Sequence, residues 1–80
     1  MAIAFVTIKV QVGKIKEVLT EIRKIDNVLE AYSITGPYDI IIKIQGDNLE
    51  NVAKMIVTKV HEIAGVQDTV TYLVIDLEKS

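Results

Sequence analysis

The apolar residues of this 80-residue chain follow two different spacings in turn. Residues 2–10 are almost continuously hydrophobic, which is typical of a strand that is covered on both faces. From residue 14 to residue 25 the apolar positions change to the i, i+3, i+4, i+7 spacing of an amphipathic helix. Gly13 separates these two segments, and the pair Asp26-Asn27 is expected to end the helix.

Two further strands and a turn follow this helix. Residues 28–35 and 39–45 both have the β-branched and aliphatic composition of strands. Between them, Gly36-Pro37-Tyr38-Asp39 has the signature of a turn, because proline presets the backbone of a central turn position. The two strands are therefore expected to pair as an antiparallel hairpin.

The second half of the chain repeats the order strand, helix, strand. Asp47 followed by Glu50 has the spacing of a helix capping box. Apolar residues at helical spacing continue from there to a stop signal at Gly65. Residues 67–77 are expected to form the last strand.

The resulting β-α-β-β-α-β order predicts an α+β fold of the ferredoxin-like type. In that plan a four-stranded antiparallel sheet carries both helices on one face, and its other face is left uncovered. Sheets with one face in water alternate cleanly between apolar and polar residues, but residues 2–10 and 67–77 present apolar side chains to both faces. The chain is therefore expected to dimerise through its sheet, and the strand edges could extend the assembly into a larger ring.

Composition excludes several functions. The chain has no cysteine and a single histidine, His61, so no structural zinc site and no cofactor are expected. The net charge of −2 argues against direct nucleic-acid binding, which requires a surplus of basic residues. Charged residues interrupt every apolar run before it reaches membrane-spanning length, and the first residues lack the pattern of a signal peptide. A cytoplasmic protein without a membrane partner is expected.

No catalytic residues are expected, because His61 lies on the polar side of its helix and has no suitable serine and aspartate near it in the pattern. Asp39 is the carboxylate with two open interpretations. It could be a turn aspartate that accepts a hydrogen bond from a nearby amide, or a charged group at the rim of a cleft between subunits. In the second case it would suit a ligand's ammonium group.

The stretch from Glu30 to Ile44, EAYSITGPYDIIIKI, resembles the signature of the C-terminal effector domain of the Lrp/AsnC family, the RAM domain (regulation of amino-acid metabolism). The signature consists of a tyrosine-containing strand, a Thr-Gly-x-aromatic-Asp turn and an aliphatic strand with a basic residue. Gly65-Val66 with Thr69 and Thr71 is similar to the end of the same domain. The resemblance covers nearly the whole chain and implies a single RAM domain over residues 1–80 that lacks a DNA-binding domain.

The resemblance implies a non-enzymatic module that binds an amino acid between subunits. Its implied partners are other copies of the same chain, in rings of dimers such as an octamer or decamer, and full-length Lrp/AsnC relatives, whose transcription regulation it would modulate. Asp39 would bind the ligand's ammonium group, and backbone amides around the turn together with a threonine hydroxyl would bind its carboxylate. The residues carried over by position are Tyr32, Thr35, Gly36, Tyr38, Asp39, Thr69 and Thr71.

Two other functions remain open at this point. Small dimeric α+β barrel enzymes share the β-α-β-β-α-β plan, although this sequence offers no interior histidine, aspartate or arginine for catalysis. ACT-type domains bind amino acids on a similar topology, with their characteristic turn between the first strand and the first helix. Here Val12-Gly13-Lys14 would have to serve as that turn.

Overall fold

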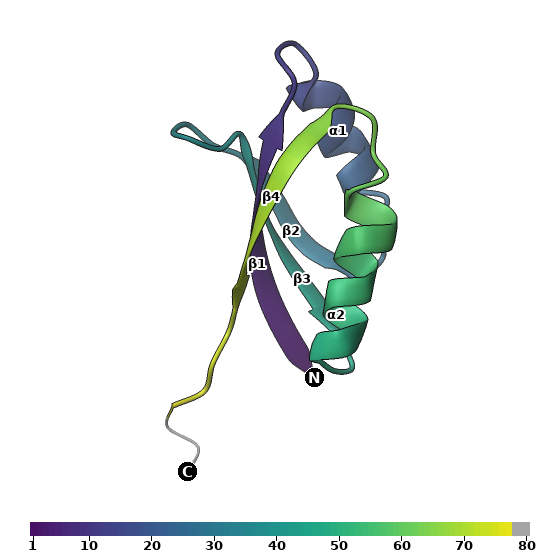
Figure 1. Ribbon diagram of the computed structural model, residues 1–80, viewed down its shortest axis with the longest axis vertical. Helices are drawn as coiled ribbons and strands as arrows, with labels where there is room; N and C mark the ends of the chain where they lie inside the picture. Colours follow the sequence, from purple (N-terminus) through teal and green to yellow (C-terminus); the bar gives the residue numbers. More distant parts are fainter. Residues whose placement is uncertain (78–80) are drawn as a thin grey trace.

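The computed structural model describes residues 1–77, and it contains one four-stranded antiparallel sheet with helices on one face (Figure 1). The sheet has the order β2-β3-β1-β4, which places β1 and β3 in the centre and leaves β2 and β4 as edges. The predicted ferredoxin-like fold is confirmed. The elements are β1 (Ala2–Val10), α1 (Ile15–Ile22), β2 (Val28–Ser33), β3 (Ile40–Gly46), α2 (Leu49–Met55), η1 (Ile56–Val60) and β4 (Val66–Leu73).

The element boundaries differ from the predicted ones by a few residues. Helix α1 is shorter at its C-terminal end than the predicted segment 14–25, and β4 ends four residues before position 77. The predicted cap at Asp47 is wrong by one residue, because Asn48 is the N-cap of α2. The Asn48 side-chain oxygen accepts a hydrogen bond from the Asn51 N–H at 2.8 Å.

The second helix continues from α2 into η1, a turn of π-helix. The His61 N–H donates to the Ile56 carbonyl at 2.9 Å, an i→i+5 bond that inserts one extra residue into the turn. Val52, Ile56 and Val60 all stay buried through this change of geometry. None of the helices in residues 1–77 is long and apolar enough to cross a bilayer.

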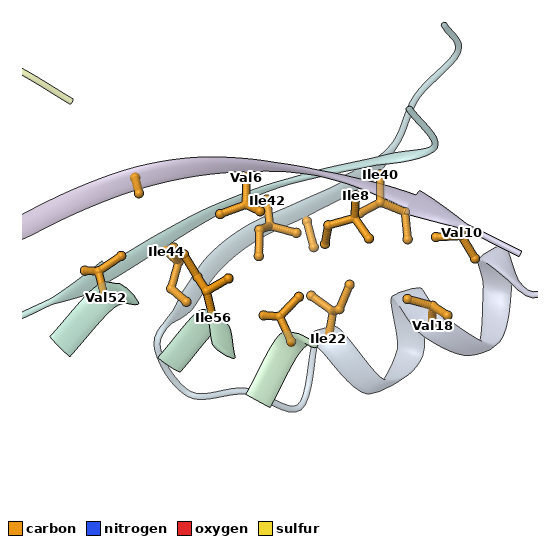
Figure 2. Packing of buried hydrophobic residues seen from close by; sticks show 13 residues of the cluster. Val6, Ile8, Val10, Val18, Ile22, Ile40, Ile42, Ile44, Val52 and Ile56 are labelled. Atoms are coloured by element: carbon orange, nitrogen blue, oxygen red, sulfur yellow. The ribbon is translucent and has the colours of Figure 1, made fainter. Parts of the chain in front are cut away.

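The core lies between the sheet and the helices, as Figure 2 shows. Alternate residues of β1 and β3 point into it, and α1, α2 and η1 cover them with their apolar stripes. The side chains that fill it are aliphatic throughout, and no polar or charged residue within positions 1–77 is buried. The cluster consists of Ala4, Val6, Ile8, Val10, Val18, Ile22, Ala31, Ile40, Ile42, Ile44, Val52, Ile56 and Val60.

Two glycines let the helices approach the sheet closely. Gly46 ends β3 beneath α2, where an added Cβ would lie 2.9 Å from Met55 Cε and 3.0 Å from Val52 Cγ2. Gly65 precedes β4 with a φ of +103°, a conformation that side chains with a Cβ rarely adopt, and an added Cβ would lie 3.0 Å from Val18 Cγ2. Gly65 lies in the turn before β4, and the second helix already ends at Val60 with His61 as its C-cap, so the helix stops earlier than the signal at Gly65 predicted.

The face of the sheet opposite the helices, here called the open face, has no covering element among residues 1–77 (Figure 1). The strand register places rows of side chains across it, because directly paired residues point to the same side. Thr7 pairs with Ile41 on one side and Val70 on the other, and Phe5 pairs with Lys43 and Tyr72. Most of these side chains are apolar and partly exposed. The prediction that the strands offer apolar residues to both faces is therefore confirmed.

Candidate ligand-binding site

The connection between β2 and β3, residues 34–39, holds four of the predicted ligand-binding residues, Thr35, Gly36, Tyr38 and Asp39. Backbone bonds fix its base to the sheet. The Ile34 N–H donates to the Asp39 carbonyl at 2.9 Å, and the Asp39 N–H donates to the Ile8 carbonyl at 3.0 Å. Thr35 and Gly36 are exposed at the tip, whereas Tyr38 and Asp39 are half-buried at the base.

The Asp39 carboxylate binds the end of β1. Its Oδ2 accepts a hydrogen bond of 2.8 Å from the Val10 N–H, 29 residues away in sequence. On the same strand, Lys9 Nζ donates to the Pro37 carbonyl at 3.2 Å. These two contacts clamp the β2–β3 connection onto β1. Within residues 1–77, Asp39 Oδ1 has no hydrogen-bond partner, so the carboxylate keeps one unoccupied oxygen.

The tip of the connection exposes backbone donors. Gly36 has a φ of +130°, and the space around it is open, because an added Cβ would meet nothing within 4 Å. No group among residues 1–77 accepts a hydrogen bond from the N–H of Gly36 or Tyr38. Free N–H groups in a turn can bind an anion such as a carboxylate.

Tyr32 lies on β2 and points to the open face, since it pairs with Ile41. Its hydroxyl donates to Glu30 Oε1 at 2.7 Å, and Glu30 Oε2 lies 3.8 Å from Lys43 Nζ. Lys43 in turn lies 6.0 Å from the centre of the Phe5 ring. The group surrounds a small hollow of about 130 Å³ lined by Phe5, Glu30, Tyr32, Ile41, Ile42 and Lys43.

The hydrogen bond to Glu30, followed by the negative charge of Glu30, raises the pKa of Tyr32 above its ordinary value of 10.0. We therefore expect Tyr32 to ionise at higher pH in the native protein than in the Glu30→Gln variant. The hydrogen bond from the neutral Tyr32 hydroxyl to Glu30 stabilises the folded protein at pH values below the ordinary tyrosine pKa. This contribution to stability is lost as the pH rises through the raised pKa of Tyr32. Ultraviolet absorbance of tyrosinate during an alkaline titration measures this, and Tyr32→Phe identifies the phase that belongs to Tyr32. Equal titration of native protein and Glu30→Gln would contradict the assignment.

Thr69 and Thr71 lie on β4, on the side of the sheet that faces the helices, because they pair with the buried residues Ile8 and Val6. Thr69 Oγ1 is 2.7 Å from His61 Nε2, at the end of η1. A hollow of about 270 Å³ adjoins this pair and is lined by His61, Val66, Gln67, Asp68 and Thr69. The sequence pattern placed His61 on a solvated helix face, and the contact with Thr69 could not be read from it.

The structure thus brings four of the seven predicted residues together and leaves three apart. Strand β1 separates the β2–β3 connection from β4. Tyr32 and the two threonines also lie on opposite faces of the sheet. Lys9, which binds the Pro37 carbonyl, and His61, which contacts Thr69, were missed as site residues, because both contacts form only when separate elements pack together.

Comparison with known proteins identifies the family. Residues 3–80 match the family model described as the Lrp/AsnC ligand binding domain. Over 77 residues the chain is 36% identical to the HTH-type transcriptional regulator FL11 of Pyrococcus furiosus, which covers 96% of the chain and 50% of the regulator. The chain therefore spans about half the length of this curated relative.

Solved structures agree with the sequence match. The crystal structure of FFRP-DM1 superimposes with a TM-score of 0.89 at 32% identity, covering 94% of this chain and all of that one. The transcriptional regulator NMB0573 of Neisseria meningitidis, solved as a complex with L-Met, has the same fold, with a TM-score of 0.84 at 20% identity. That match covers 99% of this chain and 53% of the regulator. With its whole length matched and its fold shared, this chain belongs to the Lrp/AsnC ligand-binding domain family.

Proposed function

We propose that this chain is a non-enzymatic regulatory module that assembles from copies of itself in the cytoplasm and binds an amino acid between them. The observation that carries the proposal is the match of residues 3–80 to a ligand-binding domain whose relatives are transcriptional regulators. Binding between subunits stabilises the assembled form by mass action, which regulates without catalysis.

The open face supports the proposed assembly. Phe5, Tyr32 and Tyr72 are 38%, 53% and 54% exposed on it, and these aromatic side chains adjoin Ile41 and Val70. A contiguous apolar patch of this kind marks an interface in soluble proteins. Two copies would pack their open faces together, and such dimers would form a ring such as an octamer or decamer. A full-length Lrp/AsnC relative could use the same face, and the module would then modulate that regulator.

The geometry of the β2–β3 connection supports an amino-acid ligand. Asp39 Oδ1 would accept a hydrogen bond from the ligand's ammonium group, while Oδ2 stays bound to the Val10 N–H. The N–H groups of Gly36 and Tyr38 and the hydroxyl of Thr35 would bind the ligand's carboxylate. Tyr32 points to the open face, and Thr69 and Thr71 lie on β4 on the helix side of the sheet, so we assign these three residues to the sites of neighbouring copies in the assembly.

A thermal-shift series with each common amino acid, L-methionine included, tests the proposal. We expect at least one amino acid to raise the unfolding temperature of the wild-type protein, because a ligand that binds only the folded state stabilises it. The matched variant is Asp39→Asn, which keeps an acceptor for the Val10 N–H and removes the charge. Calorimetry should show at least about tenfold weaker binding in this variant, the usual effect of losing a hydrogen bond to a charged group.

The control is Asp26→Asn, which makes the same change at an exposed aspartate between α1 and β2. It should bind as the wild type does. A wild-type protein whose unfolding temperature responds to no amino acid would contradict the sensing role. Unchanged binding in Asp39→Asn would contradict the proposed site.

A further inference from the structure

The hollow beside the start of β4, here called the β4 hollow, is lined mainly by polar side chains. It has a volume of about 270 Å³, and its lining residues are His61, Val66, Gln67, Asp68 and Thr69. All of these side chains except Val66 carry hydrogen-bonding groups. The hollow lies on the far side of β1 from the β2–β3 connection, so it is a second polar place on the surface of the chain.

The π-turn η1 sets the direction of His61. Each residue of a regular α-helix advances about 100° around the axis, so one extra residue redirects the side chains that follow it by about that angle. His61 is the C-cap of η1, and its Nε2 lies 2.7 Å from Thr69 Oγ1. The turn thus places the imidazole ring against β4, at the wall of the β4 hollow. Turns of π-helix are frequent at functional sites.

Several polar groups of the β4 hollow have no partner among residues 1–77. Asp68 Oδ1 accepts a hydrogen bond of 2.9 Å from the Thr69 N–H, which leaves Oδ2 available. His61 uses Nε2 in its contact with Thr69, so its Nδ1 is available. The side-chain amide of Gln67 makes no contact of this kind. His61, Gln67 and Asp68 are all exposed, so a molecule that enters the hollow can reach these groups.

These groups suit an uncharged side chain that both donates and accepts hydrogen bonds. Asp68 would repel a carboxylate side chain. An aliphatic side chain would displace water from the polar groups without replacing its hydrogen bonds. A cationic side chain would pair with Asp68 but would leave the Gln67 amide N–H groups without an acceptor. A carboxamide satisfies both, because its NH₂ group donates to Asp68 and its oxygen accepts from Gln67 or from His61.

We propose that the β4 hollow binds the side chain of the ligand and that this ligand is an amino acid with a carboxamide side chain, such as glutamine. The β2–β3 connection of one copy binds the ammonium and carboxylate groups of the ligand, and the β4 hollow of a neighbouring copy binds its side chain. This inference rests on the proposed function, in which Thr69 belongs to the site of a neighbouring copy. It adds the chemical class of the ligand, and it makes His61 and Asp68 the residues that determine this class.

Calorimetry of the wild-type protein with four amino acids of similar length tests the class. Glutamine should bind at least about tenfold more tightly than glutamate, methionine or lysine, since each of these three loses a hydrogen bond or gains a repulsive charge in the hollow. Methionine or lysine that binds as tightly as glutamine would overturn the proposed class.

Two substitutions test the residues. Asp68→Asn should bind glutamate more tightly than the wild type does and reduce the preference for glutamine over glutamate by about tenfold, because it removes the repelling charge. His61→Leu should weaken glutamine binding about tenfold and leave methionine binding unchanged, whereas His61→Gln should retain glutamine binding. The control is Glu62→Gln, a loss of charge at the exposed residue next to His61, which lines a different hollow between α1 and the end of the second helix. Its preferences should equal those of the wild type.

The single histidine of the chain gives a direct signal from the β4 hollow. Addition of glutamine to the wild-type protein should shift the imidazole ring signals in nuclear magnetic resonance spectra, and signals that stay in place at saturating glutamine would overturn the β4 hollow. A wild-type protein that binds no amino acid overturns the proposed function and the hollow together. Binding that Asp39→Asn weakens, but whose preferences Asp68→Asn and His61→Leu leave unchanged, overturns the hollow alone.

Discussion

Replacing Ile8 by alanine is expected to lower the free energy of unfolding by about 2–5 kcal/mol, the usual effect of removing a fully buried aliphatic side chain. Ile8 has no exposed surface and lies on β1, where it pairs with Ile40 on one side and Thr69 on the other. A domain of this length has a total stability of roughly 4–12 kcal/mol. The single substitution therefore removes a large share of what holds the fold together.

Urea unfolding at one fixed protein concentration measures this effect, because assembly makes the stability depend on concentration. Two variants calibrate the result. Ile8→Val should lose about 0.5–1.5 kcal/mol, since it deletes a single methyl group at the same site. Val57→Ala, at a position on η1 that is 58% exposed, should change stability by less than about 0.5 kcal/mol. Similar losses in Ile8→Ala and Val57→Ala would contradict the position of the core.

The type and order of the elements could be predicted from residue spacing, because spacing reports which side chains share a face. In β1 the buried residues Ala4, Val6 and Ile8 alternate with Phe5 and Thr7 of the open face. The near-continuous hydrophobicity of the strand already required two apolar faces. The same reasoning holds for α1, whose buried residues Val18 and Ile22 are four positions apart.

The details of the helix ends depended on contacts that spacing does not encode. Asp47 and Asn48 are both good capping residues, and the Asp47–Glu50 spacing favoured the first. Asn48 is the N-cap in the structure, because its backbone is extended, with a φ of −153°, immediately before the first helical residue. The π-turn at Ile56–Val60 was also missed, since a single added residue leaves an apolar stripe almost unchanged.

The sequence placed four of the candidate site residues in one turn, and their ligand-binding role stays a prediction, but the contacts that this turn makes could not be predicted. The identity of Asp39 as a notable carboxylate came from its place after Gly36-Pro37-Tyr38. Its partner, the Val10 N–H, lies on a different strand and becomes a neighbour only when β1 pairs with β3. The interpretation of Asp39 as a turn aspartate that accepts from an amide is confirmed by this bond, and its interpretation as a ligand's partner stays a prediction.

The substitution with the largest effect on assembly is expected at the open face. In Tyr72→Asp the proposed dimer should dissociate, with a dissociation constant raised by about three orders of magnitude. The interface would bury a carboxylate without a paired cation, and two-fold symmetry would bring two such groups into it. Each factor of ten corresponds to about 1.4 kcal/mol, so the expected change is about 4 kcal/mol, within the range for an unpaired charge at an interface. Light scattering across a dilution series measures the shift from dimer to monomer.

The matched control is Leu49→Asp. Leu49 is 53% exposed and Tyr72 is 54% exposed, so the two substitutions remove similar contacts within one chain. Leu49 begins α2 on the opposite side of the molecule, where an added carboxylate is favourable at a helix N-terminus. If the open face is the interface, only Tyr72→Asp dissociates the dimer, and Tyr72→Phe retains it. Equal masses for Tyr72→Asp and Leu49→Asp would mean that the subunits meet elsewhere, and the ligand site would then have to be sought within one chain, around Asp39 alone.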